Sequence, residues 1–233
     1  MLKLDRSGMR AEANVHSRTL RGAMPHRGYR LLLHRYRRYA PDYDRHYARY
    51  SDGTLARALA LTPDIDGDLL DVACGTGLFE ANLRQRRPRL RITGVDISPE
   101  MLANARRRFA GDDRVQFLQG TAEQLSVESN SFDIISCNNA FHLVQDASAA
   151  LREFHRVLRA RGTLIIIDWC RNAPQMALMT AGQRLLDRQT RHVRGVREMR
   201  VLLAEHRFDV QRCERFRVRP MWGLMAFSAL RRD

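Results

Sequence analysis

The stretch 69-LLDVACGTGLFE-80 decides the fold expected for this chain. An apolar run ends in Asp71, and glycines follow at positions 75 and 77. A buried strand that runs into a glycine turn and then a helix is typical of open α/β sheets, which bind ligands at the carboxyl ends of their strands. Glycine permits positive φ and lets a ligand approach the backbone closely. The stretch therefore predicts a binding turn, and its form suits dinucleotides and other adenosine ligands.

Strand-like and helix-like runs alternate after this turn. Near-continuous apolar runs such as 163-TLIIID-168 are expected of parallel strands that are buried on both faces. Runs of about ten residues with helical spacing lie between them, which indicates βαβ units. The predicted strands cover 68–73, 90–96, 115–119, 132–137, 163–169, 208–217 and 221–230, and the predicted helices cover 78–87, 99–109 and 148–159.

The expected fold class is α/β, with a Rossmann-like sheet of seven mostly parallel strands, helices on both faces and an antiparallel C-terminal hairpin strand. Residues 28–233 are expected to form one domain, preceded by a polar, flexible segment over 1–27. Within the domain, the pattern predicts N-terminal helices over 28–61, divided at Pro41, and a helical insertion over 171–200 on the substrate side.

Two further helix ends carry local signals. Ser98 is expected to cap the helix that begins at Pro99, because serine accepts a backbone hydrogen bond there and proline suits the first turn. Gly162 is expected to follow the last turn of the helix over 148–159.

The composition is that of an ordinary globular domain, apart from a formal net charge of +14. Arginine supplies 39 of the 40 basic Lys and Arg residues, and arginines occur throughout the chain. Without a recognition motif beside them, nucleic acid is not the expected main partner, whereas peripheral contact with an anionic membrane surface is compatible with this charge. No apolar run approaches the ~20 residues of a membrane span, and the N-terminus lacks an apolar signal segment, so a cytoplasmic location is expected.

The cysteines give no sign of a metal or redox site. Their spacing matches neither a zinc site nor a CxxC pair. Buried free thiols in a reducing compartment are the expected state, and no metal is expected. The four cysteines are Cys74, Cys137, Cys170 and Cys213.

Two acidic side chains near the turn discriminate between adenosine ligands. A dinucleotide turn needs a small third residue in G-x-G-x-x-G, and Glu80 stands there, where its charge and bulk oppose a pyrophosphate. Asp71 is also the wrong sign for phosphate, but it suits a cation. Asp96 ends the second strand, where an acid can bind both ribose hydroxyls. S-adenosylmethionine, a cationic adenosine ligand without phosphate, fits this pattern best.

At this point the chain resembles the class I S-adenosylmethionine-dependent methyltransferases, in the subgroup that includes the ubiquinone and menaquinone C-methyltransferases. The resemblance runs in family order and spacing across about a hundred residues. The matching stretches are 70-LDVACGTG-77, 94-GVDISPEMLANAR-106, 120-GTAEQLSVESNSFDIISCNNAFHLVQD-146 and 151-LREFHRVLRARGTLIIID-168.

The resemblance implies a role for each matching position. The first turn would line the methionine moiety, Asp96 would bind the ribose, and the next two loops would hold the adenine. The end of the fourth strand would lie beneath the methyl group, and an N-terminal helix would cap the cofactor. The implied cofactor-binding residues are Asp71, Ala73, Gly75, Gly77, Asp96, Ile97, Met101, Thr121, Ala122, Glu123, Asn138, Asn139, Tyr39 and Tyr43.

Two departures from the family pattern stand out. The family often has Asp at the position of Thr121, so the contact to the adenine amino group would be weaker here or made by backbone. It also often has Pro-Phe where this chain has Ser126 and Val127.

Other interpretations stay open for several of these residues. Asp71 would also suit a turn, and Asp96 a helix cap. Tyr39, Tyr43, Tyr47 and Tyr50 would equally suit core packing. His142 follows the fourth strand and is the candidate general base, although a structural histidine fits as well.

The expected reaction is in-line transfer of the methyl group, which leaves S-adenosylhomocysteine and needs no protein nucleophile or metal. Trp169, Trp222 and the Met and Leu residues of the insertion indicate a small lipidic or aromatic acceptor, or simply helix packing. The alternatives are an RNA-directed methyltransferase or RNA-binding protein, a non-catalytic cofactor-binding protein of the same fold, and an NAD(P) oxidoreductase. The sequence leaves the acceptor and the oligomeric state open.

Overall fold

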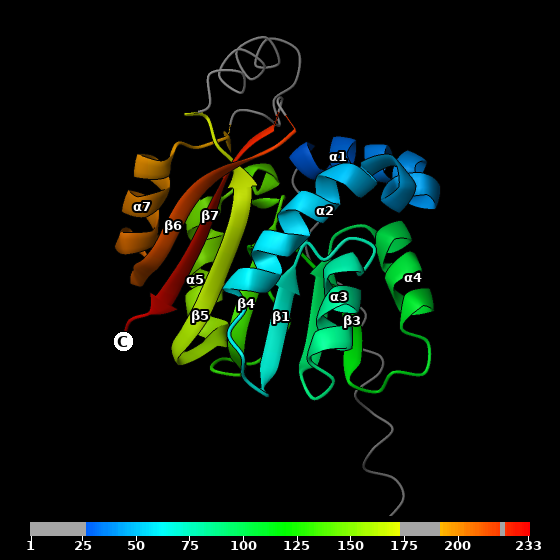
Figure 1. Ribbon diagram of the computed structural model, residues 1–233, viewed down its shortest axis with the longest axis horizontal. Coiled ribbons are helices and arrows are strands. Elements are labelled where there is room, and N and C mark those ends of the chain that lie inside the picture. Colours follow the sequence, from blue (N-terminus) through cyan, green and yellow to red (C-terminus); the bar gives the residue numbers. More distant parts are fainter. Residues whose placement is uncertain (1–26, 173–191, 220–221) are drawn as a thin grey trace, which may run out of the picture.

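The computed structural model describes residues 27–172, 192–219 and 222–233, and its centre is a single sheet (Figure 1). The strands are β1 (Asp68–Val72), β2 (Arg91–Asp96), β3 (Val115–Gln119), β4 (Phe132–Asn138), β5 (Leu158–Trp169), β6 (Phe208–Val218) and β7 (Trp222–Arg231). They lie in the order β3-β2-β1-β4-β5-β7-β6. The first five strands are parallel, and β7 pairs antiparallel with both β5 and β6.

Helices cover both faces of this sheet and one of its ends. They are α1 (Arg27–Tyr39), η1 (Ala40–Asp42), α2 (Tyr43–Leu61), α3 (Leu78–Arg86), α4 (Pro99–Arg108), η2 (Phe141–Leu143), α5 (Ala147–Val157) and α7 (Val196–Glu205). One core cluster joins α2, α3 and α4 to the sheet, and the other joins α5 and α7 to the opposite face. Figure 1 shows α1 across the end at which the parallel strands finish.

The predicted fold class is confirmed, because β4 and β5 are buried nearly throughout and alternate with amphipathic helices. Ile134, Ile135 and the apolar run 164–167 are at most 1% exposed. Residues 1–26 of the predicted segment 1–27 and residues 173–191 of the predicted insertion 171–200 lie outside the described residues. Within the part of the chain that is described, no helix has the length and apolar character to cross a membrane.

One predicted helix end is right and the other is wrong. Ser98 Oγ accepts a hydrogen bond from the Met101 amide at 3.3 Å, and Pro99 begins α4. Gly162, however, lies inside β5, because α5 already ends at Val157 and Leu158 pairs with β4. A Cβ atom at Gly162 would lie 2.9 Å from the Arg159 carbonyl oxygen. The glycine is needed for this close approach of backbone, and not to end a helix.

The glycine turn after β1 has the left-handed backbone that its sequence predicts. Gly75 has φ 58° and Gly77 has φ 77°. The Gly77 amide donates to the Cys74 carbonyl oxygen at 3.2 Å, and Gly77 then starts α3 as its N-cap. A Cβ atom at Gly77 would lie 3.1 Å from the Phe109 ring, so the residue also lets α3 pack closely.

Gly77→Ala is expected to lower the free energy of unfolding by about 2–4 kcal/mol. The loss has two causes, the strain of a left-handed backbone at alanine and the crowding of its Cβ atom against the Phe109 ring. Gly111→Ala is the matched control, because Gly111 has φ 89° and open space around its Cβ position. It should cost only about 1–2 kcal/mol, the strain alone. Urea unfolding of both variants measures the difference, and equal losses would show that crowding at Gly77 contributes nothing.

Candidate cofactor site

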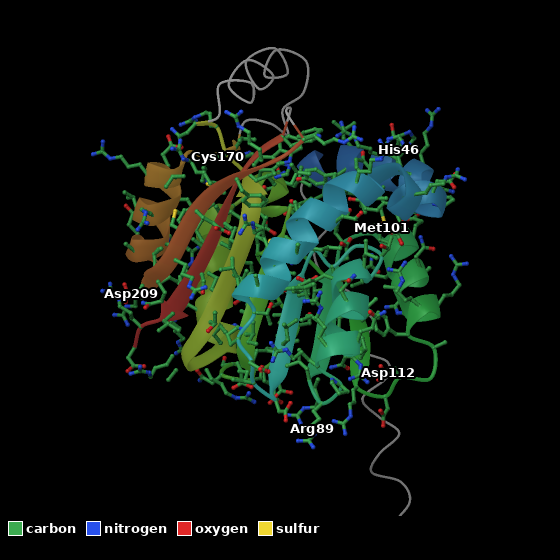
Figure 2. All side chains as sticks on the ribbon, in the orientation of Figure 1. His46, Arg89, Met101, Asp112, Cys170 and Asp209 are labelled. Atoms are coloured by element: carbon green, nitrogen blue, oxygen red, sulfur yellow. The ribbon has the colours of Figure 1, made fainter. Side chains whose placement is uncertain are left out.

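A cavity lies between helices α1 and α2 and the carboxyl ends of β1, β2 and β4. Its empty volume is about 1140 Å³, counting the part that is open to solvent. Figure 2 labels Met101 at the end of α4 that faces α1, whereas Arg89 and Asp112 lie at the opposite end of the sheet. The predicted residues that line the cavity are Tyr43, Asp71, Ala73, Gly75, Asp96, Ile97, Met101, Thr121, Ala122, Asn138 and Asn139.

Four predicted residues do not line it. Gly77 is turned toward Phe109, and Tyr39 stacks on His46 at the surface with 39% of its area exposed. Glu123 accepts hydrogen bonds from the Tyr29 hydroxyl at 2.6 Å and from the Gln145 amide at 2.9 Å. It therefore fixes α1 to the loop after β4, and Tyr29, not Glu123, reaches the cavity wall.

His142 is the fourth of these, and it is buried behind the wall. Its Nδ1 lies 2.5 Å from Asp168 Oδ1, and its ring stacks on Trp169 with centroids 4.3 Å apart. Only 4% of the residue is exposed. This position suits a side chain that orients Trp169, and it gives no direct path from the imidazole to the cavity.

Asp71 ends β1 as a buried carboxyl group on the cavity wall. Ser136 Oγ donates to its Oδ1 at 2.5 Å. Burial raises the pKa of Asp71 to about 7, although the hydrogen bond from Ser136 acts in the opposite direction. The group thus titrates near neutral pH in the free protein, and a cation beside it would favour the ionised form.

Glu80 lies next to Asp71 but does not reach the cavity. Its side chain is fully buried, and neither carboxyl oxygen has a hydrogen-bond partner among the described residues. Burial, followed by the charge of Asp71, raises the pKa of Glu80 well above its ordinary value. The protonated form of Glu80 is therefore favoured, and its buried side chain occupies the position where a dinucleotide turn needs a small residue.

Asp96 ends β2 and holds the glycine turn as well as facing the cavity. Its Oδ2 accepts from the Gly75 amide at 2.9 Å, and its Oδ1 accepts from the Ser98 amide at 2.8 Å. A carboxylate has about four lone-pair sites, so each oxygen retains capacity for another donor. Asp96 therefore holds the turn and the start of α4, and its carboxyl group still has room to accept hydrogen bonds from a ligand hydroxyl in the cavity.

The end of β4 contributes two asparagines. Asn138 Oδ1 is buried without a hydrogen-bond partner among the described residues, a state that costs free energy unless a ligand donates to it. Asn139 accepts a hydrogen bond from the Tyr50 hydroxyl at 2.8 Å and donates to Thr54 Oγ1 at 3.0 Å. Asn139 thus joins α2 to the sheet at the cavity.

The sequence analysis missed most of the aromatic wall. Tyr29, Tyr36 and Tyr50 line the cavity together with Tyr43. Tyr29 and Tyr36 lie seven positions apart on α1, and Tyr43 and Tyr50 lie seven positions apart on α2, so each pair falls on one face of its own helix. Burial raises the pKa of all four hydroxyls, so they remain neutral donors. The seven-residue spacing was the signal in the sequence that could have identified them.

Asp44 was also missed, and it attaches α2 to the glycine turn. Its Oδ1 accepts from Thr76 Oγ1 at 2.5 Å, and its Oδ2 pairs with Arg108. Arg108 also donates to the Thr76 carbonyl oxygen at 2.9 Å. No local pattern in the sequence indicates this contact, which joins residues far apart in the chain.

The charges on the wall select the kind of ligand. Asp44, Asp71 and Asp96 line the cavity, whereas no Arg, Lys or His does so among the described residues. In a chain with a net charge of +14, an acidic cavity favours a cation and disfavours a phosphate. The unpaired Asn138 Oδ1 fits an ammonium donor, and the Asp96 carboxylate fits a ribose. S-adenosylmethionine has both groups.

The fold and the site therefore define a Rossmann-like domain for an adenosine cofactor without phosphate. Comparison with known proteins narrows this to one class of enzyme domain. Residues 70–166 match the family model described as a methyltransferase domain. The matched residues thus form a methyltransferase domain, and the chain has the fold of the class I methyltransferases, whose methyl donor is S-adenosylmethionine. This confirms the resemblance found in the sequence.

A curated relative is the demethylmenaquinone methyltransferase of Chlorobaculum tepidum, 38% identical over 100 residues, which are 43% of this chain and 40% of that protein. A solved structure of a putative methyltransferase in complex with the Trm112 methyltransferase activator of Haloferax volcanii has a TM-score of 0.74 and 20% identity, and the match covers 84% of this chain and 96% of the other. The [4+2]-cyclase SpnF has a TM-score of 0.64 and 18% identity, covering 78% and 81%. The chain spans less than half the length of the curated relative.

Proposed function

We propose that the protein transfers the methyl group of S-adenosylmethionine to a small-molecule acceptor of lipidic or aromatic character. The observation that carries this proposal is the charge of the cavity. Three carboxyl groups and no basic side chain line it within the described chain, although the protein as a whole is strongly basic. The methyltransferase domain over 70–166 supports the same conclusion.

The residues of the cavity position the donor and exclude water from it. When bound, the cofactor supplies a methyl group attached to a positively charged sulfur. Transfer of the methyl group leaves this sulfur as a neutral thioether. Asp71 balances the positive charge, and Asp96 holds the ribose. The four tyrosines of α1 and α2 close the cavity over the strand ends. Positioning and exclusion of water account for most of the catalysis in such a displacement.

A general base is needed only if the accepting atom must lose a proton. His142 remains the predicted candidate, but it could act as a base only after a rearrangement, because it does not line the cavity. In the position that the structure gives it, His142 is better suited to positioning Trp169.

The acceptor is inferred from the relatives and from the aromatic surface beside the cavity. The curated relative named above acts on demethylmenaquinone, which has an aromatic head and a lipid tail. Trp169 and Trp222 pack together at 5.1 Å near Tyr50, in agreement with a planar acceptor. The Met and Leu residues of the predicted insertion lie outside the described residues.

The alternatives make different predictions. An RNA-directed enzyme would bind RNA with a steep dependence on salt. A non-catalytic protein would bind the cofactor without turnover, and the cyclase among the structural neighbours shows that this fold does not require methyl transfer. An oxidoreductase would bind NAD, which the acidic cavity disfavours.

A methyl-transfer screen tests the proposal. The purified protein is incubated with S-adenosylmethionine and, separately, with quinol precursors, small phenols, lipids and transcribed RNA, and both S-adenosylhomocysteine and methylated product are measured by mass spectrometry. The proposal predicts product from at least one aromatic or lipidic acceptor and none in parallel reactions with Asp96→Ala. Product from RNA alone would establish the first alternative instead.

A further inference from the structure

A second hollow lies beside the cofactor cavity and has the opposite charge. Its empty volume is about 1050 Å³, counting open solvent. It is formed by the first half of α2, the end of β5, Arg219 directly after β6 and Trp222 at the start of β7. We call it the arginine groove, and its lining residues are Arg45, His46, Tyr47, Ala48, Arg49, Tyr50, Trp169, Arg219 and Trp222.

The arginine groove has cationic groups that lack internal partners. Arg45 forms an ion pair with Asp42 at 2.9 Å, in which both side chains are largely exposed. Arg49 and Arg219 have no ion pair among the described residues, and no carboxyl group of those residues lines the groove. The three arginines are exposed, and an anion that binds among them would gain from several positive charges at once, to an extent that salt screens. Guanidinium groups bind carboxylate and phosphate with two parallel hydrogen bonds.

The floor of the groove is aromatic. The Trp169 and Trp222 ring centroids are 5.1 Å apart, and the Tyr50 and Trp222 centroids are 5.4 Å apart. Trp169 Nε1 donates to the Tyr50 hydroxyl at 2.9 Å, which fixes the relative orientation of two of the rings. Trp169 and Trp222 are half-buried and line the groove, so their exposed parts give an apolar surface against which a planar group can pack. The groove therefore suits a molecule with an apolar ring as well as an anionic group.

Tyr50 connects the groove to the cofactor cavity, because it lines both. Its hydroxyl group also donates to Asn139 at the end of β4, where the methyl group is expected. A molecule that stacks in the groove would thus lie next to the donor. The cofactor and this molecule would bind to adjoining hollows of opposite charge, which would keep each out of the other's site.

We propose that the arginine groove binds the methyl acceptor, and that it selects acceptors with a carboxylate or phosphate attached to a planar apolar body. That the bound molecule is the methyl acceptor rests on the proposed function. The groove adds the charge and the shape of that acceptor. Binding to the groove is measurable without any turnover.

Three probes that share one ring system separate the contribution of the anionic group to binding from that of the ring. They are 1-naphthol, which is uncharged, 1-hydroxy-2-naphthoate, which adds a carboxylate, and 1-naphthyl phosphate, which adds a phosphate. Each is titrated calorimetrically into the protein, with and without saturating S-adenosylhomocysteine. At least one anionic probe should bind about 10-fold or more tighter than 1-naphthol, as expected for hydrogen bonds between charged groups. The stronger of the two identifies the anion that the groove prefers.

The double variant Arg49→Gln, Arg219→Gln should reduce this preference to about 3-fold or less, because it removes the two arginines without partners. The double variant Arg197→Gln, Arg200→Gln on α7 is the matched control, since it removes two exposed arginines away from the groove, and it should leave the preference intact. An unchanged preference in the double variant of Arg49 and Arg219 would overturn the proposal. So would equal binding of all three probes to the unmodified protein.

Two further outcomes separate this inference from others. If S-adenosylhomocysteine does not bind but the anionic probes still do, the proposed function fails and the groove is an anion site without an acceptor role. If vesicles of phosphatidylcholine and phosphatidylglycerol bind and the probes do not, the arginines serve a membrane surface, and the acceptor proposal is wrong.

Discussion

Asp71→Asn is expected to weaken S-adenosylmethionine binding about 100-fold at pH 8, because it removes the buried negative charge that attracts the positively charged end of the ligand. The variant should fold, since the Asn oxygen can still accept the hydrogen bond that Ser136 donates at 2.5 Å. Isothermal titration of both proteins measures the loss. Affinity within about threefold of the unmodified protein would show that Asp71 does not face the cation.

The same variant should remove a pH dependence. Burial raises the pKa of Asp71 to about 7, so the carboxyl group of the free protein carries a proton below pH 7. A cation favours the ionised form, so binding releases that proton, and the affinity should fall up to about tenfold per pH unit below 7 and level off above it. Burial and the charge of Asp71 also raise the pKa of the neighbouring Glu80. Asp71→Asn should lose this part of the pH dependence, and any that remains would come from Asp96 or Glu80, whose pKa values burial also raises.

Asp209→Asn provides the control for net charge. Asp209 is exposed on β6, at the edge of the sheet away from the cavity, as Figure 2 shows. The substitution makes the same change in net charge, and we expect it to leave both the affinity and its pH dependence unchanged. A comparable loss in this variant would assign the effect to the overall charge of the protein.

Asp96→Ala is expected to weaken S-adenosylhomocysteine binding about 30-fold to 300-fold, because hydrogen bonds from the two ribose hydroxyls to a carboxylate would be lost. The substitution also frees the amides of Gly75 and Ser98, which donate to Asp96. Loss of these bonds would loosen the glycine turn and weaken binding by a second route.

A modified ligand separates the two routes. 2′-Deoxy-S-adenosylhomocysteine lacks one ribose hydroxyl, so it should bind less tightly than the parent compound to the unmodified protein. If Asp96 binds that hydroxyl, the two ligands should bind equally to Asp96→Ala. If the deoxy compound is penalised equally in both proteins, Asp96 acts only through the turn.

The sequence predicts most of the fold because its signals are local. The glycine turn, the buried strands and the cap at Ser98 each depend on a few adjacent residues. The prediction fails at Gly162, which lies inside β5 and not at a helix end. Glycine is required there because a Cβ atom would be too close to the Arg159 carbonyl oxygen. The sequence correctly indicates that position 162 needs a residue without a side chain. It does not show that the cause is the backbone of a strand and not a helix end.

The site is predicted less evenly than the fold. Residues of the strand ends, such as Asp71 and Asp96, reach the cavity because the parallel sheet places every such end at one edge. Side chains in the loops are directed by distant contacts, so Glu123 turns to Tyr29, and His142 turns to Asp168. The position of the helices over the cavity depends on long-range contacts of this kind, such as that of Asp44 with Thr76.

The central claim is that the acidic cavity binds a cationic adenosine ligand without phosphate. Calorimetric titration of the unmodified protein with S-adenosylmethionine and with NAD, at pH 8 and equal salt, tests it most directly. We expect one site per chain for S-adenosylmethionine and no measurable heat of binding for NAD. Tight binding of NAD, or no binding of S-adenosylmethionine, would contradict it.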